Sequence, residues 1–288
     1  MGDRFFSTFV DAATLSRHLD HPDWRICDVR HQLSDVSAGE RAYAEAHLPG
    51  AVFFHLDRDL SGAMTGQNGR HPLPDPVRLA GKLGDVGIGP KTQVVVYDDG
   101  SGMIAGRLWW LLRWLGHDHV ALLDGGYAAW VRQGGQLSSD VPVVAPCTFA
   151  TALRPKLCVG VASVERNLTA PGFLVVDARG EDRFRGENEA LDPVGGHIPG
   201  AVNRCFKDNL GPNGLLKPVD QLKQEFIRLF GTWRADQVVH QCGSGVSACF
   251  NMVSMEHAGL TGSRLYAGSW SEWCTPQAGR PVETSSVA

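Results

Sequence analysis

Cys242 is the residue of this 288-residue sequence whose surroundings best suit a nucleophile. It follows residues 238–241, an apolar run typical of the end of a buried strand. Small residues come next, and residues 249–259 have the pattern of a helix that ends at Gly259. A cysteine placed there faces converging backbone N–H groups and the positive end of the helix dipole. These surroundings favour the thiolate, so we expect Cys242 to be a nucleophile, the alternative being an inert buried thiol.

The chain contains two copies of one sequence pattern. In each copy an Asp-x-Arg motif follows an apolar run, and a His-x-Pro-Gly-Ala-Val motif follows later; the two pairs begin at Asp28 and His47, and at Asp177 and His197. Residues 95–102 then match residues 238–245, and residues 124–130 match residues 267–273. The shared order predicts a duplicated domain. Because the repeated Asp, Arg and His residues cannot explain what one copy alone does, we expect them to be structural.

Each copy alternates short apolar runs with helical patterns, which predicts the α/β class, a mostly parallel sheet flanked by helices. In the first copy, residues 94–97 form a continuous apolar run, and residues 104–115 form an apolar helix whose tryptophans we expect in the core. We expect tandem domains at residues 5–136 and 158–283, joined by a proline-containing linker at residues 137–157.

The two copies differ at the position of the nucleophile. In the match described above, Asp99 stands where the second copy has Cys242. A carboxylate cannot do thiolate chemistry, and an anion inside a loop of converging amides would satisfy those amides permanently. We therefore expect the first domain to be catalytically inactive and to form one wall of a cleft that faces Cys242, because clefts between domains are favoured ligand sites.

Composition and charge argue against several classes of function. The net charge of -4 provides no basic surface for nucleic acid, and no apolar run is long enough to cross a bilayer. The N-terminus lacks the apolar core of a signal peptide. The seven cysteines are odd in number and include neither a Cys-x-x-Cys pair nor a zinc-ligand spacing. We therefore expect a cytoplasmic protein without disulfides, metal or membrane contact.

Taken together, these motifs resemble the two-domain rhodanese-type sulfurtransferases, and the resemblance covers nearly the whole chain. It implies a rhodanese-like fold in each half, no cofactor, and a persulfide formed on Cys242 during turnover. In that family the backbone amides of the cysteine loop cradle the outer sulfur atom. The matching residues here are Gly243, Ser244, Gly245, Val246, Ser247 and Ala248.

The loop is most similar to the branch of that family that uses 3-mercaptopyruvate. Ser244 matches a serine typical of that branch, where it is proposed to act with a histidine and an aspartate that correspond to His71 and Asp57 here. Arg183 matches an arginine that binds the anionic end of the substrate; the alternative is a surface arginine paired with Glu181, Asp182 or Glu187. The branch often has a second arginine nine residues further on, which this chain lacks, and Arg185 is the candidate substitute.

The resemblance implies a reaction in two steps. The Cys242 thiolate takes sulfur from a small anionic donor, and a thiol, cyanide or a thioredoxin-like protein then accepts it from the persulfide. Two alternatives stay open, a thiosulfate:cyanide sulfurtransferase and a persulfide carrier that is not an enzyme. A cysteine phosphatase is poorly supported, because Ala248 stands where an arginine would clamp the phosphate. We expect a monomer, since two domains within one chain already supply the cleft.

Overall fold

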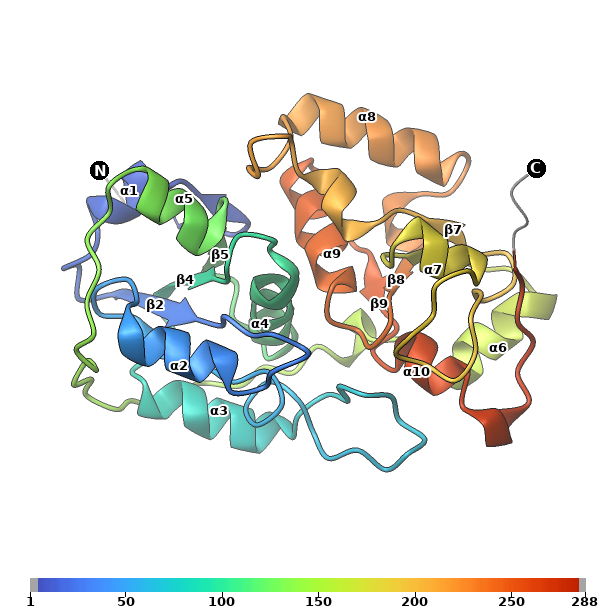
Figure 1. The fold of residues 1–288 in the computed structure, drawn as a ribbon, viewed down its shortest axis with the longest axis horizontal. Coiled ribbons are helices and arrows are strands. Elements are labelled where there is room, and N and C mark those ends of the chain that lie inside the picture. Colours follow the sequence, from blue (N-terminus) through green and yellow to red (C-terminus); the bar gives the residue numbers. More distant parts are fainter. Residues whose placement is uncertain (1–4, 285–288) are drawn as a thin grey trace. The chain divides into compact units, whose positions relative to one another are not determined.

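The computed structural model describes residues 5–284 and divides into two compact units, each with its own sheet (Figure 1). The first unit contains the chain up to residue 62, residues 74–154 and residues 211–216. The second contains residues 63–73, 155–210 and the chain from residue 217 on. Residues 63–73, which precede most of the first domain in sequence, thus belong to the same unit as Cys242.

The sheet of the first unit has five parallel strands in the order β1-β5-β4-β2-β3. Its strands are β1 (Phe9–Val10), β2 (Trp24–Asp28), β3 (Val52–Phe53), β4 (Gln93–Tyr97) and β5 (Val120–Leu123). Its helices are α1 (Ala12–Ser16), α2 (Ala38–Glu45), α3 (Pro76–Asp85), α4 (Met103–Trp114) and α5 (Gly126–Arg132). The parallel order with helical crossovers confirms the predicted α/β class for this half.

Two layers of side chains cover this sheet. On one face α1, α2 and α5 bury Leu15, Tyr43 and Trp130 against the strands. On the other, α4 packs on β4 and β5 and is buried around nearly its whole circumference, as expected of an apolar helix in a core. Trp109 and Trp110 are fully buried, which confirms that the tryptophans of this helix are core residues.

The second unit repeats this plan with four parallel strands in the order β7-β6-β8-β9. The strands are β6 (Leu174–Asp177), β7 (Val202–Asn203), β8 (Val238–Gln241) and β9 (Arg264–Leu265). The helices are α6 (Val161–Thr169), α7 (Glu181–Arg185), α8 (Val219–Phe230), α9 (Ala248–His257) and α10 (Ser269–Trp273), with 3-10 turns at Pro155–Leu157, Phe206–Asn209, Ala235–Gln237 and Pro276–Ala278. Figure 1 shows α9 beside β8 and β9, and its first eight residues are buried.

The elements around Cys242 agree with the sequence-based expectation. The predicted strand at residues 238–241 is β8, and the predicted helix is α9, two residues shorter at its C-terminal end. Gly259 has φ +78° just beyond α9, a left-handed conformation that favours glycine and ends the helix. Most of the predicted linker, residues 139–154, contains no helix or strand. It is held to the first unit, where Ala152 N–H donates to the Leu115 carbonyl at 2.8 Å.

The repeated polar motifs form equivalent buried networks in both units. Arg30 Nη2 lies 2.7 Å from the Asp28 carboxylate, and Arg179 Nη2 lies 2.7 Å from that of Asp177. His197 Nδ1 lies 2.8 Å from the Phe184 carbonyl, and the first-unit histidine makes the matching contact. These contacts confirm that the repeated residues support the fold. Among residues 5–284, no helix is both long and apolar enough to cross a membrane.

Candidate active site

Cys242 lies at the end of β8, six residues before α9, and is 2 % exposed. Its N–H donates to Ser269 Oγ at 3.1 Å, and its carbonyl accepts from Trp270 N–H at 3.0 Å. The Gly243 carbonyl accepts from Ser271 N–H at 2.9 Å. The first turn of α10 therefore holds the carbonyl side of the loop and fixes the backbone that carries the thiol.

The amide side of the loop has few protein partners. Across residues 5–284, the N–H groups of Ser244, Val246, Ser247 and Ala248 donate to no protein acceptor. Gly245 is required for this shape, because its φ is +76° and an added Cβ would lie 2.3 Å from the Ala267 carbonyl oxygen. Open amides at a helix N-terminus form a site for an anion next to the Cys242 thiol.

The strand registers correct the predicted match between the two loops. Asp28 pairs with Tyr97 between β2 and β4, and its repeat counterpart Asp177 pairs with Gln241 between β6 and β8. The residue after Tyr97 therefore corresponds to Cys242, and that residue is Asp98. The assignment of Asp99 to the cysteine position is wrong by one residue, because the first loop is one residue shorter before its helix and the similar Gly-Ser-Gly letters conceal the shift.

Asp98 fills the loop of the first unit with its own carboxylate. Oδ1 accepts from Gly100 N–H at 2.9 Å and Gly102 N–H at 3.0 Å, and Oδ2 accepts from Ile104 N–H at 3.0 Å and Ala105 N–H at 3.3 Å. An anion was expected to occupy the amides of this loop, and the residue that does so is Asp98. The neighbouring Asp99 differs, because burial and the charge of Asp98 raise the pKa of its carboxyl.

The predicted serine and histidine are brought together in the second unit. His71 Nδ1 lies 2.7 Å from Ser244 Oγ, and both side chains are buried. Residues 63–73 carry His71 there: Arg70 N–H donates to Ser271 Oγ at 3.0 Å. Gly69 makes the approach possible, because its φ is +83° and an added Cβ would lie 2.6 Å from the Gly268 carbonyl oxygen.

Asp57, the third predicted member of this relay, belongs to the first unit. Its carboxylate lies 4.0 Å from His31 Nε2 and 3.9 Å from His55 Nδ1, and its link to His71 stays a prediction. These three side chains could place ligand atoms around one metal ion. However, His55 Nδ1 accepts from Asp57 N–H at 3.1 Å and Nε2 lies 2.9 Å from the Val36 carbonyl, so neither ring nitrogen is free and we assign no metal to the cluster.

Two guanidinium groups meet at the loop beside Cys242. A Cβ added to Gly243 would lie 2.8 Å from Arg70 Nη2 and 3.7 Å from Arg183 Nη1. Arg183 was predicted to bind the anionic end of the substrate, whereas Arg70 was not identified from the sequence. The available signal was its position next to His71, which the resemblance had already placed near the site.

Arg185 does not take the place of a second arginine at this loop. Its side chain pairs with Glu181 at 2.8 Å and with Glu187 at 2.9 Å, on the exposed side of α7. Arg70 therefore supplies the second guanidinium group at Gly243.

Both loop arginines also have acidic partners. Arg183 donates to Glu189 at 2.7 Å and to Asp192 at 3.3 Å, not to the neighbours expected for a surface arginine, and Arg70 pairs with Asp192 as well. Burial would raise the pKa of Glu189, but hydrogen bonds from Arg183 hold it below its usual value. Burial raises the pKa of Asp192, and Arg70 opposes that rise.

Ser269 is a second residue that the sequence did not identify. Its φ of +55° is unusual for a residue with a side chain, and the first unit has Gly126, φ +56°, at the corresponding place. The strain is tolerated where the Ser269 hydroxyl accepts the Cys242 N–H. The pairing of a strained serine with the Cys242 backbone indicates that Ser269 positions this residue.

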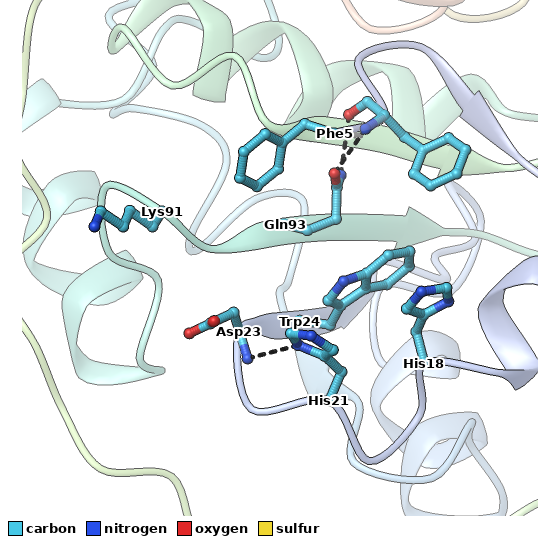
Figure 2. Close-up of a pocket in the computed structure, with 8 residues that line it drawn as sticks. Phe5, His18, His21, Asp23, Trp24, Lys91 and Gln93 are labelled. Atoms are coloured by element: carbon cyan, nitrogen blue, oxygen red, sulfur yellow. Dashed lines mark hydrogen bonds between the residues drawn. The ribbon is translucent and has the colours of Figure 1, made fainter. Parts of the chain in front are cut away.

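A cavity of about 240 Å³ in the first unit contains none of the predicted site residues (Figure 2). Trp24 and His18 line it, and the two rings stack at 4.1 Å between centroids. Gln93 also lines it and exchanges two hydrogen bonds with the backbone of Phe6. Because the amide is satisfied and no cysteine or serine of residues 5–284 lines the cavity, the Cys242 loop is the better candidate for sulfur chemistry.

Comparisons with known proteins identify the family of the chain. The family model described as "Rhodanese-like domain" matches residues 11–133 and 161–276. A Pseudomonas aeruginosa protein named "Probable 3-mercaptopyruvate sulfurtransferase" is 48% identical over 277 residues, which cover 96% of this chain and 97% of that protein. The human 3-mercaptopyruvate sulfurtransferase is 38% identical, covering 81% and 78%.

Solved structures show the same fold. The crystal structure of SseA from Escherichia coli, described as a 3-mercaptopyruvate sulfotransferase, matches with a TM-score of 0.79 and 32% identity. The match covers 92% of this chain and 99% of that one. The two-domain α/β architecture predicted from the sequence is thereby confirmed.

Proposed function

The chain belongs to the rhodanese family, with two copies of the family's domain, and on that premise we propose that it is a sulfurtransferase that uses 3-mercaptopyruvate as sulfur donor. The observation that carries the proposal is the contact of Ser244 with His71, beside Cys242 in a loop of open amides. A proton-transferring pair suits a donor that leaves as a carbanion equivalent. Thiosulfate, which leaves as sulfite, has no such need.

The first step forms a bond between the Cys242 thiolate and the sulfur atom of the donor. The carbon–sulfur bond breaks, and its electron pair stays on carbon as the enolate of pyruvate. The proton of the donor thiol reaches that carbon through Ser244 and His71, so pyruvate leaves without net proton uptake. The persulfide remains as an anion, stabilised by the loop amides and the N-terminus of α9.

The second step returns the thiolate. A nucleophile attacks the outer sulfur atom, the sulfur–sulfur bond breaks, and its electron pair returns to Cys242. We propose a small thiol, cyanide or a thioredoxin-like protein as acceptor. Such a two-step transfer follows ping-pong kinetics.

Donor binding falls to the two arginines at Gly243. The Arg70 and Arg183 guanidinium groups suit the carboxylate of mercaptopyruvate, because Arg70 Nη2 and Arg183 Nη1 together offer N–H donors to its two oxygens. Ser269 and the first turn of α10 keep Cys242 in place for the attack.

The test combines intact-mass spectrometry with steady-state rates. Brief exposure to mercaptopyruvate should add one sulfur atom to the wild type, cyanide should remove it, and Cys242→Ser should gain none. Ser244→Ala and His71→Gln should lower kcat with mercaptopyruvate by about 10²-fold or more, because they remove proton transfer. Full turnover in both variants would overturn the relay, and a clear preference for thiosulfate would overturn the choice of donor.

We also infer a cytoplasmic monomer. The seven cysteines, including Cys242, form no disulfide among the residues that the structure describes, and this suits a reducing compartment. Analytical ultracentrifugation of the full chain should give the mass of one copy; a dimer would contradict the monomer.

A further inference from the structure

Asp192 is an acidic residue in a site that is proposed to bind an anion. It lies nine residues after Arg183 in the sequence. Its carboxylate is 3 % exposed and pairs with both Arg70 and Arg183. A buried carboxylate thus contacts both guanidinium groups of the proposed donor site.

The charges around the two arginines sum to zero. Arg70 and Arg183 contribute two positive charges, and Glu189 and Asp192 contribute two negative ones. Arg179, which also lies near, is balanced by Asp177 at 2.7 Å. The corner therefore offers hydrogen-bond donors without an excess of positive charge.

Two nitrogens of the arginines beside the loop remain available to a ligand. Arg70 Nη2 lies 2.8 Å and Arg183 Nη1 lies 3.7 Å from a Cβ built on Gly243, and within residues 5–284 neither nitrogen donates to a protein acceptor. Two N–H donors match the two oxygens of one carboxylate. A second negative charge on the ligand would meet the buried Asp192 carboxylate without a further cation to offset it.

We propose that Asp192 is a specificity-determining residue that makes this site select donors with one negative charge over donors with two. The inference rests on the proposed function and refines it: a keto-acid thiol such as mercaptopyruvate is accepted, and the dianion thiosulfate is disfavoured. The repulsion between Asp192 and a bound ligand grows in proportion to the ligand's charge. Removing the Asp192 charge should therefore lower the binding free energy of a dianion by twice as much as that of a monoanion. The affinity for the dianion then rises by the square of the factor found for the monoanion.

Binding measured without turnover tests this directly. In the Cys242→Ala background, isothermal titration calorimetry compares thiosulfate, the dianion, with pyruvate, the monoanion. Adding Asp192→Asn should tighten thiosulfate about tenfold and pyruvate about threefold. Glu187→Gln is the matched control, because it removes one negative charge from the same segment at a residue paired with Arg185, and it should change neither affinity.

The rival explanation is that Asp192 only holds Arg70 in place. Asp192→Asn would then weaken both ligands or change them by equal factors, and either result overturns the proposal. Asp192→Ala removes the charge as well and decides the matter if the asparagine variant does not fold.

Turnover provides a second readout with intact Cys242. The ratio of kcat/KM for thiosulfate to that for mercaptopyruvate should rise about threefold in Asp192→Asn and stay constant in Glu187→Gln. An unchanged ratio in Asp192→Asn contradicts the proposal. Should the wild type turn over neither donor, the proposed function fails, while the calorimetric comparison still decides the role of Asp192.

Discussion

Arg70 and Arg185 are two candidates for the second arginine of the proposed donor site, and of the two only Arg70 lies at the loop. Its Nη2 is the atom nearest to a Cβ built on Gly243, whereas Arg185 is paired with Glu181 and Glu187. The difference is one of position, since both residues have the same chemistry.

This contrast yields a prediction for donor affinity. Arg70→Met should raise KM for mercaptopyruvate about 10-fold to 100-fold, because it removes a charged hydrogen bond to the donor carboxylate. Arg185→Met should leave KM unchanged, and it serves as the matched control. Steady-state kinetics on both variants measure the effect; equal KM values in the two variants would contradict the assignment of Arg70.

The sequence could not identify Arg70 by local reasoning. Its role depends on residues 63–73 belonging to the second unit, held by the contacts of Gly69 and Arg70 with the Gly268–Ser271 turn. That packing joins residues about 200 positions apart, and neither hydrophobic period nor turn chemistry encodes it. Ser244, His71 and Arg183 were identifiable because a family motif already marks them.

At the scale of elements, β8 and α9 were predictable because their signals are local. A continuous apolar run marks a buried strand, and Gly259 marks the end of the helix. The residue-by-residue match between the two loops was not predictable from the sequence. The first loop is one residue shorter, and the similarity of the Gly-Ser-Gly letters favoured Asp99 over Asp98. Strand register, a long-range property, was needed to correct it.

β8 also carries a histidine that should make stability depend on pH. Burial lowers the pKa of His240 to about 3. Its Nδ1 has no hydrogen-bond partner in the part of the chain that the structure describes, and Nε2 lies 3.0 Å from Met255 Sδ. Between pH 6.5 and 3 the unfolded chain binds a proton at this residue and the folded chain does not. The free energy of unfolding therefore falls as pH falls through this window, by about 1.4 kcal/mol per pH unit.

The measurement is urea denaturation at pH 7 and pH 5, where most carboxylates stay ionised. The wild type should lose about 2 kcal/mol more than His240→Leu between these two values. The comparison of slopes removes the contributions of His31 and His117, whose pKa values burial also lowers and which both proteins retain. Identical slopes would show that His240 is not buried in its neutral form.

At the scale of the whole molecule, the two units differ in what binds the amides of the equivalent strand-to-helix loop. The second leaves its amides open beside Cys242, and the first ties four amides to the Asp98 carboxylate. The first loop thus contributes to stability without any ligand, since hydrogen bonds to a charged acceptor are among the stronger ones.

Neighbouring carboxylates allow a sharp test of that contribution. Asp98→Asn should destabilise the first unit by about 3 kcal/mol, because it removes the charge and one of the two acceptor oxygens. Asp99→Asn should cost nothing, since burial and Asp98 already raise the pKa of Asp99 and oppose its ionised form. Hydrogen exchange of peptides from β4, α4 and β5 measures the effect; equal protection in both variants would refute it.

The loop around Asp98 differs from the Cys242 loop in two independent ways, residue type and length. Asp98→Cys alone would put a thiol into a loop that is one residue shorter than that of Cys242. The same substitution would take from four amides the carboxylate that now accepts their hydrogen bonds. A second active site could therefore not be engineered by one substitution, and the loop would have to be lengthened as well.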